Sequence, residues 1–125
     1  MARVAQRPVM LAVLDDGDRS ALLKLSLIAR GWDVLRAHSC EQARSVADGM
    51  HLDALLTDLI LGDGSAFGLL KSMSARPRVA AVLTWGNQHG IRDRILASGF
   101  DLHLVRPITA EEIDLALRDK LRRTA

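Results

Sequence analysis

Residues 55–64 read LLTDLILGDG, and this stretch places one carboxylate, Asp58, in the middle of an apolar run. Burying a carboxylate costs free energy unless a charge or hydrogen bonds balance it. A short run that is apolar throughout is typical of a strand covered on both faces, as in a parallel sheet. We therefore expect a buried strand that delivers Asp58 to an edge of the sheet.

Five short apolar runs recur along the chain, separated by segments with helical spacing. Strands that alternate with helices of about ten residues form βαβ units around a parallel sheet. Because such crossovers are right-handed, they place helices on both faces. The pattern predicts an α/β fold with a doubly wound, five-stranded parallel sheet flanked by five helices. The runs are VMLAVL (9–14), DVLRA (33–37), ALLTDLI (54–60), VAAVLTW (79–85) and DLHLV (101–105).

Periodicity and capping residues locate the helices. The first begins near Asp18 or Arg19 and ends at Gly31, because glycine can adopt the left-handed conformation that closes a helix. Capping boxes begin the second helix at SCEQ (39–42) and the fifth at TAEE (109–112). The third and fourth cover about residues 65–75 and 88–98. The first helix has a broad apolar stripe, formed by Leu22, Leu25, Leu27, Ile28 and Ala29.

Composition bounds the class of protein. The 125 residues predict a single domain over 1–125, with a core of about 8–122 and no output domain. Two Trp, two Phe and no Tyr predict an aliphatic core. Cys40 is the only cysteine, which excludes a disulfide within the chain, and we expect it in the core or at a helix start. No stretch has the ~20 apolar residues that cross a bilayer, so we expect a soluble, cytoplasmic protein.

Polar side chains stand where four of the five predicted strands end. In an open α/β sheet, ligands bind at the carboxyl ends of the strands. Crowded carboxylates repel one another unless a cation joins them, and hard oxygen ligands suit Mg²⁺. A divalent ion and a basic side chain can hold a phosphoryl group, and a carboxylate can be its nucleophile. Each residue alone has an ordinary interpretation, such as a turn after the first strand. The polar set is Asp15, Asp16, Asp58, Thr84 and Arg106, which Pro107 follows.

Four motifs, in this order and spacing, make residues 8–122 resemble the receiver domain of bacterial two-component response regulators. They are VLDD (13–16), LLTDLILGDG (55–64), VLTW (82–85) and LVRP (104–107). The resemblance implies a flavodoxin-like receiver fold with strand order 2-1-3-4-5. It also implies transfer of a phosphoryl group from a sensor histidine kinase or phosphotransfer protein, with Mg²⁺.

The resemblance assigns roles to individual residues. Asp58 looks like the phosphoacceptor, and Thr84 resembles the switch hydroxyl that bonds a phosphoryl oxygen. Asp16 and Asp58 resemble direct Mg²⁺ ligands, together with the backbone carbonyl of Ile60. Asp15 resembles a second acid that acts mostly through water.

Several positions depart from the family pattern. Arg106 replaces the family's Lys and either clamps the phosphoryl group or pairs with Asp58 and holds the empty site shut. Trp85 replaces a small residue and either crowds the acceptor or turns away to pack on the fourth helix. His103 replaces the aromatic switch residue; we expect a surface histidine, with a pH-sensitive contact as the alternative. Pro107 follows Arg106 as in the family, which predicts a cis peptide bond.

Three functions follow from these residues. The first is a stand-alone response regulator, not an enzyme, that acts through a downstream protein partner. The second is a pseudo-receiver that binds partners without phosphorylation. The third, a phosphate-ester hydrolase, is disfavoured because Ile60 stands where a second acid is required. We expect no membrane and no direct DNA binding, since no helix-turn-helix follows residue 122. The face formed by the predicted fourth helix, fifth strand and fifth helix carries Arg92, Arg94 and His103, and it would allow a homodimer.

Overall fold

Five parallel strands form the centre of the computed structural model, which describes residues 6–86 and 88–124. Their spatial order is β2-β1-β3-β6-β7, which confirms the predicted 2-1-3-4-5 order of the five main strands. Register aligns Leu11 with both Leu35 and Leu55, so the strands at the centre bring aliphatic side chains side by side. The strands are β1 (Val9–Val13), β2 (Asp33–Ala37), β3 (Ala54–Asp58), β6 (Val79–Trp85) and β7 (Leu102–Arg106).

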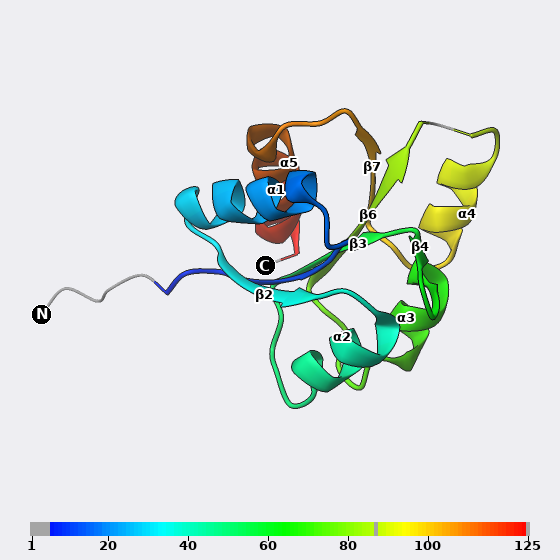
Figure 1. Cartoon of the computed structure of the whole chain (residues 1–125), viewed down its shortest axis with the longest axis horizontal. Helices are drawn as coiled ribbons and strands as arrows, with labels where there is room; N and C mark the ends of the chain where they lie inside the picture. The colour runs from blue at the N-terminus through cyan, green and yellow to red at the C-terminus, as the bar shows by residue number, and fades with distance from the viewer. Residues whose placement is uncertain (1–5, 87, 125) are drawn as a thin grey trace, which may run out of the picture.

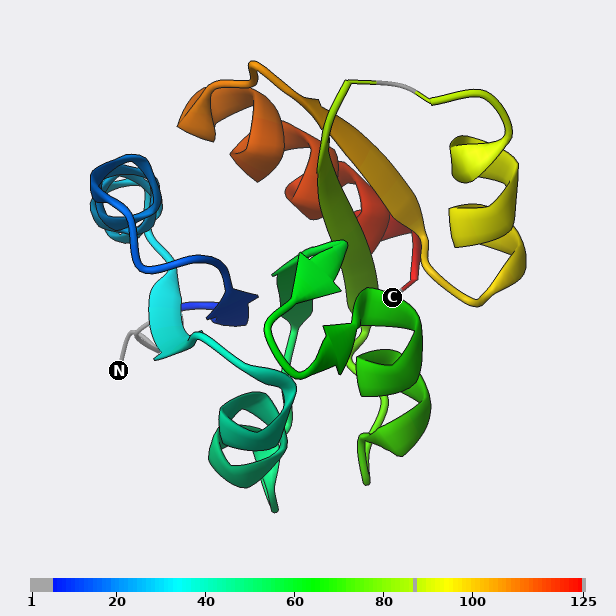
Figure 2. The same cartoon turned by 45° about the vertical axis from the view of Figure 1, so that its right-hand side comes forward.

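Helices cover both faces of this sheet, as Figure 1 and the turned view of Figure 2 show. One face carries α1 (Asp18–Ala29) and α5 (Ala110–Arg123). The opposite face carries α2 (Cys40–Ala47), α3 (Ala66–Ser72) and α4 (Ile91–Ala97). The predicted doubly wound α/β fold is therefore confirmed. Within the described residues, every helix is too short or too polar to cross a membrane.

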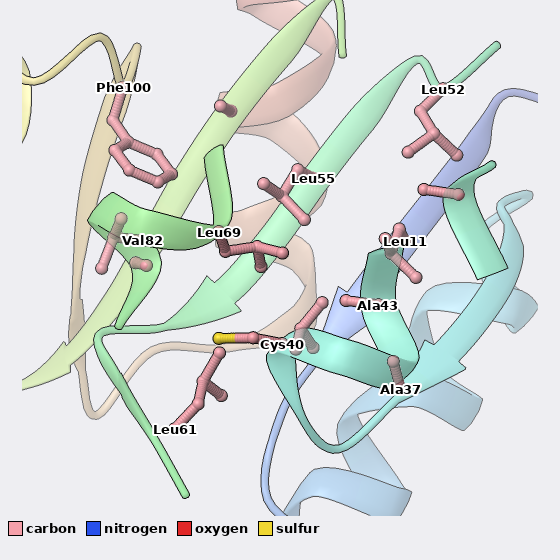
Figure 3. Packing of buried hydrophobic residues seen from close by; sticks show 14 of the residues in the cluster. Leu11, Ala37, Cys40, Ala43, Leu52, Leu55, Leu61, Leu69, Val82 and Phe100 are labelled. Carbon is pink, nitrogen blue, oxygen red and sulfur yellow. The ribbon is translucent and has the colours of Figure 1, made fainter. Parts of the chain in front are cut away.

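The core consists of two aliphatic layers, one on each face of the sheet. Figure 3 shows the layer beneath α2 and α3, where Leu11, Leu55 and Val82 meet Leu69 and other helix residues. Cys40 is buried in this layer at the start of α2, as predicted. The other layer contains a fully buried aromatic side chain, Trp32, which the prediction of an aliphatic core did not include.

Local sequence signals locate most helix ends. Gly31 follows α1 with φ +104°, a left-handed conformation that glycine adopts without a steric penalty. The predicted capping box of α5 is present: Thr109 Oγ1 accepts from the Glu112 amide, and Glu112 accepts from the Thr109 amide. At α2, Ser39 caps the helix, but Gln42 accepts from the amide of His38 rather than that of Ser39.

Several boundaries differ from the predicted ones. The third strand ends at Asp58, and a short hairpin follows it, formed by β4 (Ile60–Leu61) and β5 (Gly64–Ser65). The third and fourth helices are shorter than expected, with seven residues each. Asp63 in the hairpin accepts hydrogen bonds from the amides of Cys40 and Glu41, at 2.7 and 3.0 Å. These bonds, which lower the pKa of Asp63, tie the hairpin to the first turn of α2.

The expected inner face of α1 is wrong. Leu27 is buried, but Leu22 and Leu25 are 65% and 61% exposed, and the helix instead buries Ser20 and Lys24. Leucines occur on more than one side of this helix, so apolar spacing alone did not distinguish the buried side. Ser20 is held inward by its hydrogen bond to Asp15, which fixes the rotation of the helix.

A buried acid, Asp114, ties α5 to the end of α1. Its carboxylate accepts from Trp32 Nε1 at 2.7 Å, Arg118 Nε at 2.6 Å and Arg30 Nε at 3.0 Å. Burial acts to raise the pKa of Asp114, but these three hydrogen bonds together bring it below its ordinary value. Because the charged form is satisfied, Asp114 stabilises the fold at neutral pH.

Replacing Asp114 by Ala is expected to lower the free energy of unfolding by about 3 kcal/mol, since it leaves a buried indole N–H and two guanidiniums without their acceptor. Urea denaturation near neutral pH measures the loss. Asp119→Ala is the matched control on the same helix, because Asp119 pairs with Arg122 and Arg123 at the surface. It should cost less than about 0.5 kcal/mol. Equal losses in the two variants would contradict the role of Asp114.

Candidate functional site

The predicted polar residues gather at one rim of the sheet because all five strands are parallel. Asp58 ends β3, while Thr84 and Trp85 end β6. Arg106 ends β7 and is joined to Pro107 by a cis peptide bond, as predicted. Asp15 follows β1. A cleft of about 610 Å³ opens above Asp58, and Asp15, Thr84, Trp85 and Arg106 all line it.

Asp58 is engaged through both carboxylate oxygens. Arg106 Nη2 donates to Oδ1 at 2.6 Å, and the backbone amide of Asp15 donates to Oδ2 at 3.0 Å. The side chains of Arg106 and Asp58 are only 13% and 15% exposed, so solvent screens this ion pair weakly. The arrangement matches the predicted alternative in which Arg106 pairs with Asp58. A charge-assisted contact of this kind balances the carboxylate that LLTDLILGDG places at the end of a buried strand.

The Asp15 carboxylate points to the start of α1. Its Oδ1 accepts from the hydroxyl of Ser20 and, at 3.3 Å, from the amide of Gly17. The Ser20 hydrogen bond is the main reason that the pKa of Asp15 lies below its usual value. Asp15 therefore has two structural tasks: its amide holds Asp58, and its side chain anchors α1.

The Asp16 carboxylate turns away from Asp58. It is exposed and lies 3.7 Å from Nε2 of His38, beside a different cleft. Among residues 6–86 and 88–124, no three acidic, histidine or cysteine side chains are grouped closely enough to hold a metal ion. The oxygen ligands predicted for Mg²⁺ are of the right chemical type, and Asp15 and Asp58 line one cleft, but the Asp16 carboxylate does not converge with them. The assignment of Asp15, Asp16, Asp58 and the Ile60 carbonyl to a metal stays a prediction.

His103 is buried and hydrogen-bonded to Thr84, so the expectation of a surface histidine is wrong. Nε2 of His103 lies 2.7 Å from Thr84 Oγ1, and only 6% of His103 is exposed. Thr84 Oγ1 also donates to the carbonyl of Gly86 at 2.9 Å. Since the Thr84 hydroxyl donates its proton to Gly86, the tautomer of His103 that satisfies this contact is the one that donates through Nε2–H. The predicted alternative, a contact that depends on pH, is the one this geometry supports.

The second ring nitrogen of His103 is not satisfied. Nδ1 is the one buried side-chain nitrogen or oxygen without a hydrogen-bond partner in the part of the chain that the structure describes. A proton there would be a buried donor with no acceptor. Burial, and to a smaller extent the positive charge of Arg92, lower the pKa of His103 below its usual value.

Trp85 does not pack on the fourth helix, so that alternative is wrong. The side chain is 63% exposed, and the guanidinium carbon of Arg106 lies 5.0 Å from the centre of its ring. The guanidinium carbon of Arg19, on α1, lies 5.9 Å from the same ring. The sequence showed that Trp85 adds bulk at this rim, but not that it stacks on the base beside Asp58.

The sequence interpretation missed two residues at the rim, Ser20 and Arg19, and a third, Asp63, that ties the hairpin after β3 to α2. Ser20 and Arg19 contact the rim only because α1 begins directly above it. Asp63 could have been suspected from the GDG that closes LLTDLILGDG, since Asp and Gly mark turns. Its partners on α2 lie more than twenty positions away in sequence, so no local pattern identifies them.

Comparisons with known proteins agree with this fold. The chain is 29% identical over 121 residues to the transcriptional regulatory protein TrcR of Mycobacterium tuberculosis, which covers 94% of this chain and 47% of TrcR. A two-component response regulator structure from Clostridium difficile is 26% identical with TM-score 0.82, covering 94% of this chain and 98% of that chain. No family model matches the chain.

A third similar protein is the receiver domain of sensor histidine kinase PA1611 from Pseudomonas aeruginosa, whose structure has a magnesium ion coordinated in the active site cleft. It is 24% identical with TM-score 0.78, covers 94% of this chain and 99% of that chain, and shows the fold alone. The fold therefore places the chain in the receiver class of doubly wound proteins. In sequence and in fold, the chain is similar to response regulators and their receiver domains. The chain spans about half the length of the curated relatives that it matches.

His103 should make stability depend on pH. The unfolded chain takes up a proton on this residue near pH 6.5, whereas the folded chain resists it. The contribution of His103 to the free energy of unfolding is therefore complete above about pH 6.5 and is lost as the pH falls below that value. The wild type should lose stability as the pH falls. His103→Gln, which can still donate to Thr84, should reduce this loss in the free energy of unfolding by up to about 1 kcal/mol.

Urea denaturation at about pH 7.5 and about pH 5.5 measures this difference. His51→Gln, a change at an exposed histidine, is the control and should retain the wild-type pH dependence. If His103→Gln destabilises equally at both pH values, His103 does not titrate as described.

Proposed function

We propose that this domain is a signalling switch that accepts a phosphoryl group on Asp58 and signals through altered contacts with a downstream protein. The donor would be a sensor histidine kinase or a phosphotransfer protein of the cytoplasm. The domain would catalyse only its own phosphorylation and dephosphorylation, so it would not act as an enzyme on a separate substrate.

The observation that carries this proposal is the ion pair between Asp58 and Arg106 at the floor of an open cleft. A carboxylate oxygen of Asp58 would attack phosphorus, and the bond from phosphorus to the donor would break. An acyl phosphate would form on Asp58. Arg106 already lies beside the attacking group, and its planar guanidinium can bind two phosphoryl oxygens at once.

Thr84 would provide a second contact to the transferred group. Its hydroxyl lines the cleft and donates to the carbonyl of Gly86. A phosphoryl oxygen on Asp58 would compete for that proton, because a charged acceptor binds it more strongly than a neutral carbonyl does. His103, which is bonded to Thr84, would respond to this exchange.

Mg²⁺ would supply positive charge to the phosphoryl oxygens when bound. The groups predicted to hold it are Asp15, Asp16, Asp58 and the Ile60 carbonyl, and the magnesium described for the PA1611 receiver supports a divalent cation in this class. Because the carboxylates do not converge here, a direct contact from Asp16 would require its side chain to leave His38.

The same observation favours a second function. Both oxygens of Asp58 are engaged, which is the arrangement expected of a pseudo-receiver that binds partners without phosphorylation. The relatives include transcriptional regulators about twice as long as this chain. A stand-alone mode of action, a homodimer and the absence of direct DNA binding therefore stay predictions.

The intact mass of the protein separates the two functions. After incubation with Mg²⁺ and a small phosphodonor, the wild type should gain the mass of one phosphoryl group, and Asp58→Ala should gain none. Asp93→Asn, at an exposed acid on α4, is the matched control and should gain the same mass as the wild type. Chelation of the metal should abolish the gain. A wild type that stays unmodified with small donors and with histidine kinases would contradict the proposed switch and favour the pseudo-receiver.

Arg106→Lys should accept the phosphoryl group faster than the wild type. A lysine keeps the positive charge that the family has at this position, but it lacks the planar group that stacks on Trp85 and bonds Asp58. Asp58 would therefore be free more often. The initial rate of mass gain with a small donor measures the effect, with Arg123→Lys, at an exposed arginine, as control. A slower Arg106→Lys variant would contradict this view of the site.

A further inference from the structure

Trp85 and Arg106 are direct neighbours in the sheet. Register aligns these two residues at the ends of β6 and β7, so their side chains leave the same face of the sheet. The guanidinium carbon of Arg106 lies 5.0 Å from the ring centre, within the ~6 Å range of a cation–π contact. The pair is therefore built into the strand register rather than into a mobile loop.

Arg106 is held from two directions. Its Nη2 donates to Asp58, and its guanidinium group contacts the ring of Trp85. Trp85 also contacts the guanidinium group of Arg19 at 5.9 Å, which connects it to the first turn of α1. The hydrogen bond between Ser20 and Asp15 anchors the start of α1. The indole therefore lies between Arg19 of α1 and Arg106 of β7.

Trp85 forms the wall between two clefts. It lines the cleft of about 610 Å³ above Asp58 and a second cleft of about 370 Å³ beside α1. Arg106 lines both clefts as well. An Arg106 side chain that released Asp58 would have to slide along the indole, so the ring controls where the guanidinium can go.

We propose that Trp85 is a positioning residue, which holds Arg106 in its ion pair with Asp58 and so keeps the acceptor closed until a donor displaces it. This inference rests on the proposed function, because it assigns a means of regulation to the same site. The indole touches neither Asp58 nor the transferred group in this scheme; it acts only through Arg106.

The expected size of the effect follows from the cation–π contact. At a partly exposed site, such a contact changes the equilibrium between bound and released Arg106 by about threefold. A reaction that needs released Arg106 changes its rate by the same factor, because only the open fraction reacts. The contact is therefore strong enough to regulate the rate and too weak to block the site.

Rates of phosphoryl uptake test this inference. With a small phosphodonor, Trp85→Ala should react about threefold faster than the wild type, and Trp85→Phe should stay near the wild-type rate because a ring still stacks on Arg106. Leu115→Ala, which removes an exposed apolar side chain from α5, is the control and should not change the rate.

An Arg106→Gln protein distinguishes positioning of Arg106 from steric blocking of the cleft by the indole. In Arg106→Gln, where the stacked cation is gone, adding Trp85→Ala should have no further effect on the rate. The same threefold increase in that background would mean that the indole blocks the entrance sterically, and it would overturn the inference. An unchanged or slower Trp85→Ala protein would also overturn it.

A measurement without phosphorylation keeps the two proposals apart. A double-mutant cycle of Trp85→Ala and Arg106→Gln in urea denaturation should show a coupling of about threefold in the unfolding equilibrium constant. If no variant takes up a phosphoryl group, the proposed function fails, and this cycle alone decides the inference. Independent effects of the two substitutions would then overturn it.

Discussion

The charge of Asp58 has to be balanced at the end of a strand that is otherwise buried in hydrocarbon, and the rim of the molecule is organised around this requirement. Because all the strands of the main sheet are parallel, their carboxyl ends share one edge. That edge supplies the guanidinium of Arg106 and the amide of Asp15, one for each oxygen of Asp58. The strand can therefore be buried along its length and still end on a reactive carboxylate.

The departures from the family pattern share a physical consequence. His103 holds the hydroxyl of Thr84, and Trp85 holds the guanidinium of Arg106, so both groups that would meet a phosphoryl group already have partners. In this state Asp58, Arg106 and Thr84 are engaged by neighbouring protein groups. Entry of a phosphoryl group would exchange these internal contacts for contacts with the ligand, and the balance between the two sets would determine how readily the switch operates.

Much of the fold could be predicted because its signals are local. The apolar runs located the five main strands, Gly31 and Thr109 marked helix ends, and the parallel order followed from their alternation with helices. The errors occurred where a local pattern had two solutions. Leucines on several sides of α1 did not reveal which side is buried, and a histidine in a strand did not reveal that a threonine on the neighbouring strand would bind it.

The sequence by itself determined the doubly wound sheet, the rim at which Asp58 and Arg106 meet, and the family resemblance, because strand periodicity, chain order and residue type are all readable along one dimension. Only the tertiary structure decided that Asp16 turns to His38, that Trp85 stacks on Arg106, and that His103 is buried against Thr84. These contacts join residues on different elements. Their formation depends on register, helix rotation and rotamer choice, which are set by packing across the whole domain.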